Sequence, residues 1–282
     1  MVSKSDYNEQ MVQAAYSVLL EVNRVLGEYR NGIAIIGGWV PDLILPLATE
    51  KHVGSTDVDL ALDHTLLQNP GYETIKKLLT DHDYETDPKR PFVFFRKVVV
   101  GGQEIAVEVD LLAGEYEGTG KGHRHQRVQD VQARKARGCD LVFDLNTEVT
   151  IEGTLPDGKK DTAKVRVANA VSFLVTKGMA MAGRLDEKDP YDVYYCVNNY
   201  PGGIVAMAEA FRPHLSNKLV IEGLRNIAAK FQSVEHVGPV SVADFEEVTD
   251  PEDRARIQRD AYERVQALLS QLAISTSPGA QG

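Results

Sequence analysis

Apolar residues along the first half of the chain change their spacing in a way that predicts alternating helices and strands. From Met11 to Leu26 they recur three or four positions apart, which predicts an opening amphipathic helix. The continuous run Ile33–Ile36 predicts a buried strand. A short helix is expected over 39–47, since Pro41 is tolerated in a first turn, followed by a strand over 56–62 and a helix over 72–79.

Turn residues then divide the chain into two hairpins and a helical segment. Segments 92–100 and 103–112 flank Gly101-Gly102, a strong two-residue turn signal, and segments 147–153 and 162–167 flank Pro156-Asp157-Gly158. From 169 to about 272 the pattern is helical, with breaks near 201–203 and 233–240. The pattern predicts an α/β (α+β) fold, a small mixed sheet with flanking helices, followed by a helical domain. The expected domains are 1–167 and 168–274, with a flexible tail over 275–282.

Composition narrows the class of protein. The chain has 282 residues, 43% hydrophobic and 26% charged, with a net charge of −10 that argues against wholesale nucleic-acid binding. No stretch reaches the roughly 18 apolar residues of a membrane span, and the N-terminus lacks the apolar core of a signal peptide. Cys139 and Cys196 have no metal-ligand spacing and favour a reducing, cytoplasmic location. Both are expected to be partly buried thiols rather than a disulfide.

Three aspartates carry the strongest chemical signal. Asp57 and Asp59 lie on one face of a predicted strand, because side chains alternate along a strand, and Asp110 ends an apolar run in the first hairpin. Carboxylates are preferred Mg²⁺ ligands, and two such ions can hold the attacking and leaving oxygens of a phosphoryl or nucleotidyl displacement. The alternative is three solvated strand ends. An unpaired charge in so apolar a context as that of Asp110 is costly, which favours the metal site.

These residues resemble the nucleotidyltransferase superfamily, whose signature is Gly-Gly or Gly-Ser, then Asp-x-Asp, then a third Asp. Here the signature is Gly37-Gly38, Asp57-Val58-Asp59 and Asp110. The segments 177–184 (KGMAMAGR) and 188–194 (KDPYDVY) further resemble the AbiEii family, the toxins of type IV toxin–antitoxin systems, to which the MenT-like enzymes belong. The resemblance covers about 33–198. The chain departs from the family at Trp39, where smaller residues are common, and at Pro190, which suggests a helix start with Asp189 as cap.

The resemblance implies a role for each matched residue. Asp57 and Asp59 would ligate two Mg²⁺ ions, and Asp110 would complete the second site and act as general base. The backbone N–H groups of Gly37 and Gly38 would approach the triphosphate of an NTP co-substrate, with a hydroxyl added by Ser55 or Thr56. Lys177 would bind the β- and γ-phosphates. Asp189 and Asp192 would position Lys177, Arg184 or the acceptor. The alternative for Lys177 is an exposed lysine on a helix surface. The alternative for Asp189 and Asp192 is a helix cap and a surface ion pair.

The acceptor substrate is the part of the implied reaction that the sequence determines least. The family implies the 3′ end of a tRNA, with a cognate antitoxin protein as partner. A basic stretch after Asp110 supports an RNA acceptor, because basic side chains neutralise a phosphate backbone. The alternative is a solvated surface segment, which would have the same basic composition. The residues of the basic stretch are Lys121, His123, Arg124, His125, Arg127, Arg134, Lys135 and Arg137. The rival hypotheses are a small-molecule, aminoglycoside-type nucleotidyltransferase, which an acidic chain would suit, and a catalytically silent NTP-binding module, against which the intact aspartates argue.

Overall fold

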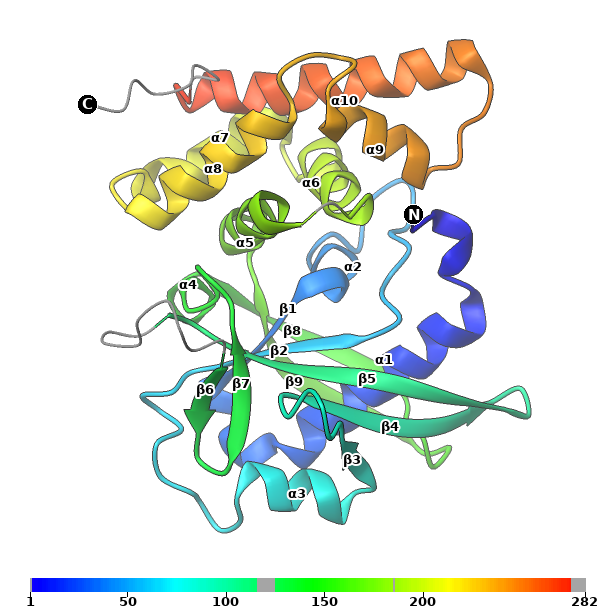
Figure 1. Ribbon diagram of the computed structural model, residues 1–282, viewed down its shortest axis with the longest axis vertical. Coiled ribbons are helices and arrows are strands. Elements are labelled where there is room, and N and C mark those ends of the chain that lie inside the picture. The colour runs from blue at the N-terminus through cyan, green and yellow to red at the C-terminus, as the bar shows by residue number, and fades with distance from the viewer. Residues whose placement is uncertain (1, 116–124, 185, 275–282) are drawn as a thin grey trace. The chain divides into compact units, whose positions relative to one another are not determined.

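The computed structural model describes residues 2–115, 125–184 and 186–274, and it divides into two compact units (Figure 1). Residues 7–44 and 53–172 form what we call the sheet unit. The described residues of 1–6, 45–52 and 173–282 form the helical unit. The sequence places a boundary at 167/168 and does not predict that 1–6 and 45–52 pack with the C-terminal helices. The predicted tail, 275–282, lies outside the described residues.

The sheet unit is built on a mixed nine-stranded sheet, which confirms the predicted α/β class. Its main path runs β3-β4-β5-β2-β1-β9-β8, and β7 pairs with the end of β5 and with β6. The bounds are β1 Ile33–Ile36, β2 Val58–Leu62, β3 Tyr84–Thr86, β4 Val93–Val100, β5 Gln103–Ala113, β6 His125–Val128, β7 Val131–Lys135, β8 Asn146–Thr154 and β9 Lys160–Ala168. The central strands β2 and β5 are parallel, whereas β1–β2 and both predicted hairpins, β4–β5 and β8–β9, are antiparallel.

Helix α1 (Glu9–Val25) covers one face of this sheet and contacts β4, β5, β8 and β9 (Figure 1). Asn8 caps it by accepting a hydrogen bond from the Met11 backbone N–H, and the buried side of the helix runs from Ala14 to Val22. The other helices of the unit are short: η2 Gly27–Gly32, η3 Gly37–Trp39, α2 Val40–Ile44, α3 Ile75–Asp81 and α4 Leu141–Asp144. The core therefore lies between α1 and the sheet.

Among the local predictions that differ from the structure, two concern segments next to the signature residues. The helix after Gly38 ends at Ile44 rather than at Leu47, because Leu45 precedes Pro46 and a residue before proline is pushed out of the α region. The β6–β7 hairpin is absent from the predicted elements. Its turn contains no glycine, and Gln129 takes the positive φ of 52° instead.

The helical unit contains η1 (Lys4–Asp6) and the C-terminal helices. These are α5 Ala170–Gly183, α6 Lys188–Asn199, α7 Gly203–Phe211, η4 Arg212–His214, α8 Lys218–Lys230, α9 Val237–Phe245 and α10 Pro251–Gln271. Both predicted breaks are confirmed, between α6 and α7 and between α8 and α9. Helix α10 packs along α6, α7, α8 and α9 (Figure 1). No helix in the described part of the chain is long and apolar enough to cross a membrane.

Candidate functional site

Strand pairing in the middle of the sheet unit aligns the signature residues. Ile36 at the end of β1 pairs with Asp59 of β2, and Asp59 pairs with Asp110 of β5. Gly37 directly follows Ile36. Three neighbouring strands therefore bring Gly37, Asp59 and Asp110 to one level of the sheet, although 73 positions of sequence separate the first from the last.

Gly37 is required by this arrangement. Its φ is +71°, a conformation that L side chains rarely adopt, and a Cβ atom at this position would lie 1.9 Å from Oδ2 of Asp59. The backbone of Gly37 thus lies directly against the Asp59 carboxylate. Only glycine allows this approach.

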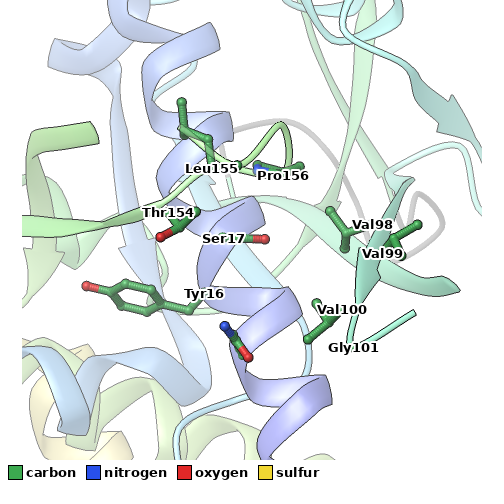
Figure 2. Close-up of a pocket in the computed structure, with 11 residues that line it drawn as sticks. Tyr16, Ser17, Val98, Val99, Val100, Gly101, Thr154, Leu155 and Pro156 are labelled. Atoms are coloured by element: carbon green, nitrogen blue, oxygen red, sulfur yellow. The ribbon is translucent and has the colours of Figure 1, made fainter. Parts of the chain in front are cut away.

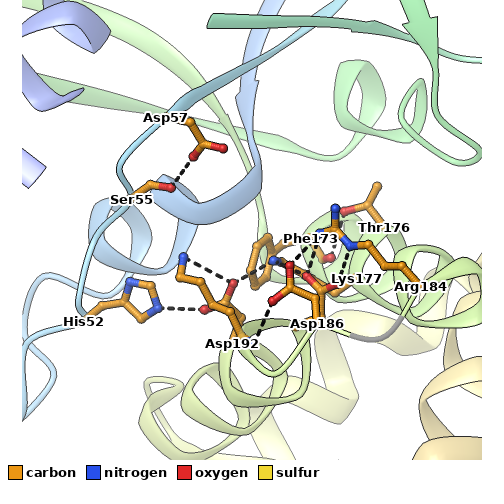
Figure 3. Close-up of polar contacts among 11 residues, drawn as sticks. His52, Ser55, Asp57, Phe173, Thr176, Lys177, Arg184, Asp186 and Asp192 are labelled. Atoms are coloured by element: carbon orange, nitrogen blue, oxygen red, sulfur yellow. Dashed lines mark hydrogen bonds and ion pairs between the residues drawn. The ribbon is translucent and has the colours of Figure 1, made fainter. Parts of the chain in front are cut away.

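Asp57 lies one residue before β2 and is held from two sides. The Ser55 hydroxyl donates to Oδ1 of Asp57 at 2.6 Å (Figure 3), and Nε1 of Trp39 donates to the Asp57 backbone carbonyl at 2.8 Å. Trp39 is buried and meets the ring of Tyr16 edge-on at 5.3 Å. The bulky residue after Gly38 therefore packs into the core and supports the loop that carries Asp57.

Asp110 is paired with an arginine of the β6–β7 hairpin. Nη2 of Arg134 lies 2.9 Å from Oδ2 of Asp110, while Oδ1 of Asp110 is buried and has no hydrogen-bond partner among the described residues. Burial raises the pKa of Asp110 to about 6. Arg134 opposes that rise, and the negative charges of Glu108 and Asp57 add to it. A carboxyl group with this pKa is ionised at neutral pH and can accept a proton.

The donor set fits Mg²⁺ in its chemistry. All three side chains are carboxylates, and the buried, unpaired Oδ1 of Asp110 is an atom that a cation would satisfy. Among the described residues, however, no three His, Cys, Asp or Glu side chains lie close enough together to hold a metal ion. Mg²⁺ commonly takes one or two carboxylates and completes its shell with substrate phosphates. The residues therefore suit a site in which ligands from outside the protein complete the shell of the ion, and two-ion binding stays a prediction.

A second polar cluster lies inside the helical unit and contains the other predicted residues. Nζ of Lys177 on α5 lies 2.7 Å from Oδ1 of Asp189 and 2.7 Å from Oδ2 of Asp192, both on α6 (Figure 3). The guanidinium of Arg184 lies 2.8 Å from the other oxygen of Asp189. Gly178 lets α5 approach α8 beside Lys177, since a Cβ there would lie 2.2 Å from the Gly223 carbonyl oxygen.

Burial and charge decide the protonation of this cluster. Lys177 and both aspartates are buried, whereas the Arg184 side chain is half exposed. Burial alone would lower the pKa of Lys177, but Asp189 and Asp192 outweigh it and hold that pKa above its usual value. Burial would likewise raise the pKa of Asp192, but Lys177 and Lys188 hold it below its usual range. All these groups therefore stay charged at neutral pH, and Lys177 is not the exposed helix lysine of the alternative hypothesis.

His52 belongs to this cluster and was not predicted. Its Nε2 lies 2.9 Å from Oδ1 of Asp192 (Figure 3), and both side chains are fully buried. The imidazole also stacks on Tyr191, with ring centroids 5.6 Å apart. The Tyr195 hydroxyl donates to the Glu50 carbonyl at 2.6 Å and holds the same segment. No local signal marks His52, because residues 45–52 pack on α6 more than a hundred positions away in sequence.

The predicted role of Asp189 as a helix cap is wrong. Helix α6 begins at Lys188 with Glu187 as its N-cap residue, so Asp189 is already helical and Pro190 is the third residue. Proline fits there because the first N–H groups of a helix have no intrahelical partner. The Asp186 side chain accepts from the Lys188 N–H instead, and the Asp189 carboxylate is left for Lys177 and Arg184.

The basic stretch is only partly described, since Lys121, His123 and Arg124 lie outside the described residues. Its second half forms the β6–β7 hairpin rather than a helix face. Arg134 on β7 pairs with Asp110, and Arg137, two residues beyond the end of β7, pairs with Glu115 at 2.8 Å. Its described arginines are thus partly neutralised by acidic neighbours.

The sheet unit also contains a cavity of about 410 Å³, and none of its described lining residues belongs to the signature (Figure 2). It lies between α1 and the turns of the β4–β5 and β8–β9 hairpins, and it is lined among others by Tyr16, Val98 and Leu155. All of its described lining residues are uncharged. Such a lining offers no counter-charge to a triphosphate.

Both cysteines are buried and free, as predicted. Burial raises the pKa of both thiols, so neither is a reactive nucleophile at neutral pH.

Comparison with known proteins gives one distant structural likeness. No protein-family model matches the chain, and no curated protein matches it. A solved structure named "Crystal structure of putative nucleotidyltransferase from H. pylori" is similar at 11% sequence identity with a TM-score of 0.47, over 93% of this chain and 96% of that one. This likeness is too distant to assign a function to the chain.

Proposed function

We propose that this chain is a metal-dependent nucleotidyltransferase that takes a nucleotide from an NTP. The supporting observation is the alignment of Gly37, Asp59 and Asp110 across β1, β2 and β5, with the glycine backbone against a carboxylate. The sequence resemblance to the superfamily rests on the same residues. Bound Mg²⁺ would supply charge neutralisation for the triphosphate, with Asp57, Asp59 and Asp110 as its protein ligands.

The proposed reaction is an in-line displacement at the α-phosphorus. The acceptor hydroxyl oxygen forms a bond to phosphorus, the bond to the bridging oxygen breaks, and pyrophosphate leaves. Asp110 is proposed to orient the hydroxyl and to take its proton, a general-base role that a carboxylate can fill. The N–H groups of Gly37 and Gly38 are proposed to face the phosphates, together with the hydroxyl of Ser55 or Thr56.

The polar cluster in the helical unit supports the positioning role that the sequence resemblance implies for Asp189 and Asp192. Asp189 and Asp192 do contact Lys177, and Asp189 contacts Arg184, as positioning residues would. A contact between Lys177 and the β- or γ-phosphate stays a prediction. The half-exposed guanidinium of Arg184 is the more accessible of the two cations.

The acceptor we propose is the 3′ end of a tRNA, with the chain acting as the toxin of a type IV toxin–antitoxin pair in the cytoplasm. Only the sequence resemblance supports this finer assignment. A small polyhydroxy amine of the aminoglycoside type is the second candidate. The pairing of Arg134 and Arg137 with carboxylates, in a chain of net charge −10, favours it.

One labelling experiment separates these acceptors. Purified protein is incubated with Mg²⁺, each α-labelled NTP, and either total tRNA or an aminoglycoside panel. Label in tRNA supports the toxin hypothesis, and label in an aminoglycoside supports the second candidate. If neither acceptor is labelled with any NTP, the proposed activity on both classes is refuted.

A further inference from the structure

Arg134 occupies an unusual place for a basic residue, directly on a proposed metal ligand. Strand β7 runs parallel to the end of β5 and pairs Arg134 with Leu112, two residues beyond Asp110. This register brings the guanidinium to Oδ2 of Asp110 at 2.9 Å. Its carbon also lies 5.9 Å from the centroid of the Phe92 ring. The pairing strand and the aromatic ring together hold the guanidinium in place.

The ion pair between Arg134 and Asp110 is incomplete on both sides. Nε of Arg134 and Oδ1 of Asp110 are both buried, and neither has a hydrogen-bond partner among the described residues. The Arg134 side chain as a whole is 40% exposed, so its outer end faces solvent. The neighbouring Arg90 is committed elsewhere, with two hydrogen bonds of 2.8 Å to Glu108. Arg134 therefore keeps N–H donors that its pairing with Asp110 does not use.

We propose that Arg134 makes divalent-cation binding at Asp110 depend on a bound triphosphate. The inference rests on the proposed function, because it takes Asp110 as a metal ligand. A guanidinium on one carboxylate oxygen repels a cation that binds the other oxygen. A cation that arrives with a triphosphate brings anionic oxygens, which match the planar fork of an arginine and offset its charge.

The size of the repulsion sets the expected effect. A single positive charge about 5 Å from a divalent ion changes affinity roughly tenfold even at the dielectric constant of water, and more in a partly buried site. Loss of the hydrogen bond from Arg134 to Asp110 acts in the opposite direction. The Asp110 side chain is only 14% exposed, and this burial strengthens the repulsion of a divalent ion by Arg134 more than it strengthens one hydrogen bond. Repulsion therefore dominates for the free ion, whereas attraction to the phosphates dominates for the metal–triphosphate complex.

The test compares two probes by isothermal titration calorimetry: free Mn²⁺ and preformed Mn²⁺–tripolyphosphate. In Arg134→Gln, the affinity for free Mn²⁺ is expected to rise at least tenfold, while the affinity for the complex falls. Arg134→Lys keeps the charge and should leave free Mn²⁺ affinity near that of the wild type. Arg127→Gln is the matched control, since it removes one charge from the same hairpin at a side chain whose Nε donates to the Gln129 carbonyl.

The outcomes are distinguishable. If Arg134→Gln binds free Mn²⁺ no more tightly than the wild type, the inference is overturned, while the proposed function stands as long as the wild type binds the complex. If the wild type binds neither probe, the inference and the proposed metal site both fail. Equal gains in Arg127→Gln and Arg134→Gln would also overturn it, because the effect would then be one of overall charge. Fluorescence of Trp39, the single tryptophan, checks that each variant is folded.

Discussion

Replacing Asp110 by asparagine should stabilise the protein in metal-free buffer, because the structure places a costly charge there. The pKa of Asp110 rises from its ordinary 3.8 to about 6, mainly through burial, and the attraction of Arg134 is already included in that value. The difference corresponds to about 3 kcal/mol of unfolding free energy when the group is ionised. Its side chain is only 14% exposed, so solvent screens little of this cost.

The sign of the pH dependence follows from the raised pKa. Between about pH 4 and pH 6 the folded state holds the Asp110 proton more tightly than the unfolded chain does. Wild-type stability therefore falls as the pH rises through that window, and the full cost is present above it. Asp110→Asn should match the wild type near pH 4 and exceed it by about 3 kcal/mol at pH 7.5.

Urea unfolding in EDTA, followed by the fluorescence of Trp39, measures this difference. Glu148→Gln, which removes an exposed carboxylate from β8, is the control and should change stability little at either pH. If Asp110→Asn is no more stable than the wild type at pH 7.5, the charge of Asp110 costs nothing in the fold. The reasoning from burial would then be wrong.

Three further predictions follow from the same geometry. Gly37→Ala, whose added Cβ would meet a carboxylate oxygen at 1.9 Å, should abolish nucleotide transfer, whereas Gly27→Ala, which meets nothing within 4 Å, should transfer normally. Lys177→Met should cost about 3–5 kcal/mol in urea unfolding followed by circular dichroism, because it removes the buried cation that Asp189 and Asp192 share at 2.7 Å. A loss below about 1 kcal/mol would contradict that pairing. The pKa values of Asp189 and Asp192 are lowered in the fold, so their contribution to stability is present above about pH 4 and is lost as the pH falls further. Acid unfolding of the wild type, compared with a variant that lacks both charges, should show this loss.

Local signals explain what the sequence predicted correctly. The run Ile33–Ile36 is an isolated apolar segment of strand length, and it forms β1 without change. The β4–β5 hairpin follows from Gly101-Gly102, because both glycines take positive φ values that few other residues tolerate. The sequence could place Asp59 and Asp110 in one site because each lies on a strand that its own local pattern predicts.

The missed contacts all depend on pairings between distant segments. The sequence places Arg134 in the basic stretch, and only the parallel pairing of β7 with β5 brings it to Asp110, 24 positions earlier. His52 lies in a segment without periodicity and meets Asp192 across 140 positions. A single sequence carries no signal for either pairing, so the partners of the predicted site residues could not be read from it.

In the proposed function, the carboxylates of the sheet unit catalyse the transfer of a nucleotide. The most direct measurement compares α- and γ-labelled NTP in the presence of Mg²⁺, tRNA and the aminoglycoside panel, for the wild type and Asp59→Asn. We expect the wild type to move the α-label to an acceptor and to release the γ-label in pyrophosphate, and we expect EDTA or Asp59→Asn to abolish both. Transfer of the γ-label to an acceptor, or undiminished transfer of the α-label by Asp59→Asn, would refute nucleotide transfer by these carboxylates.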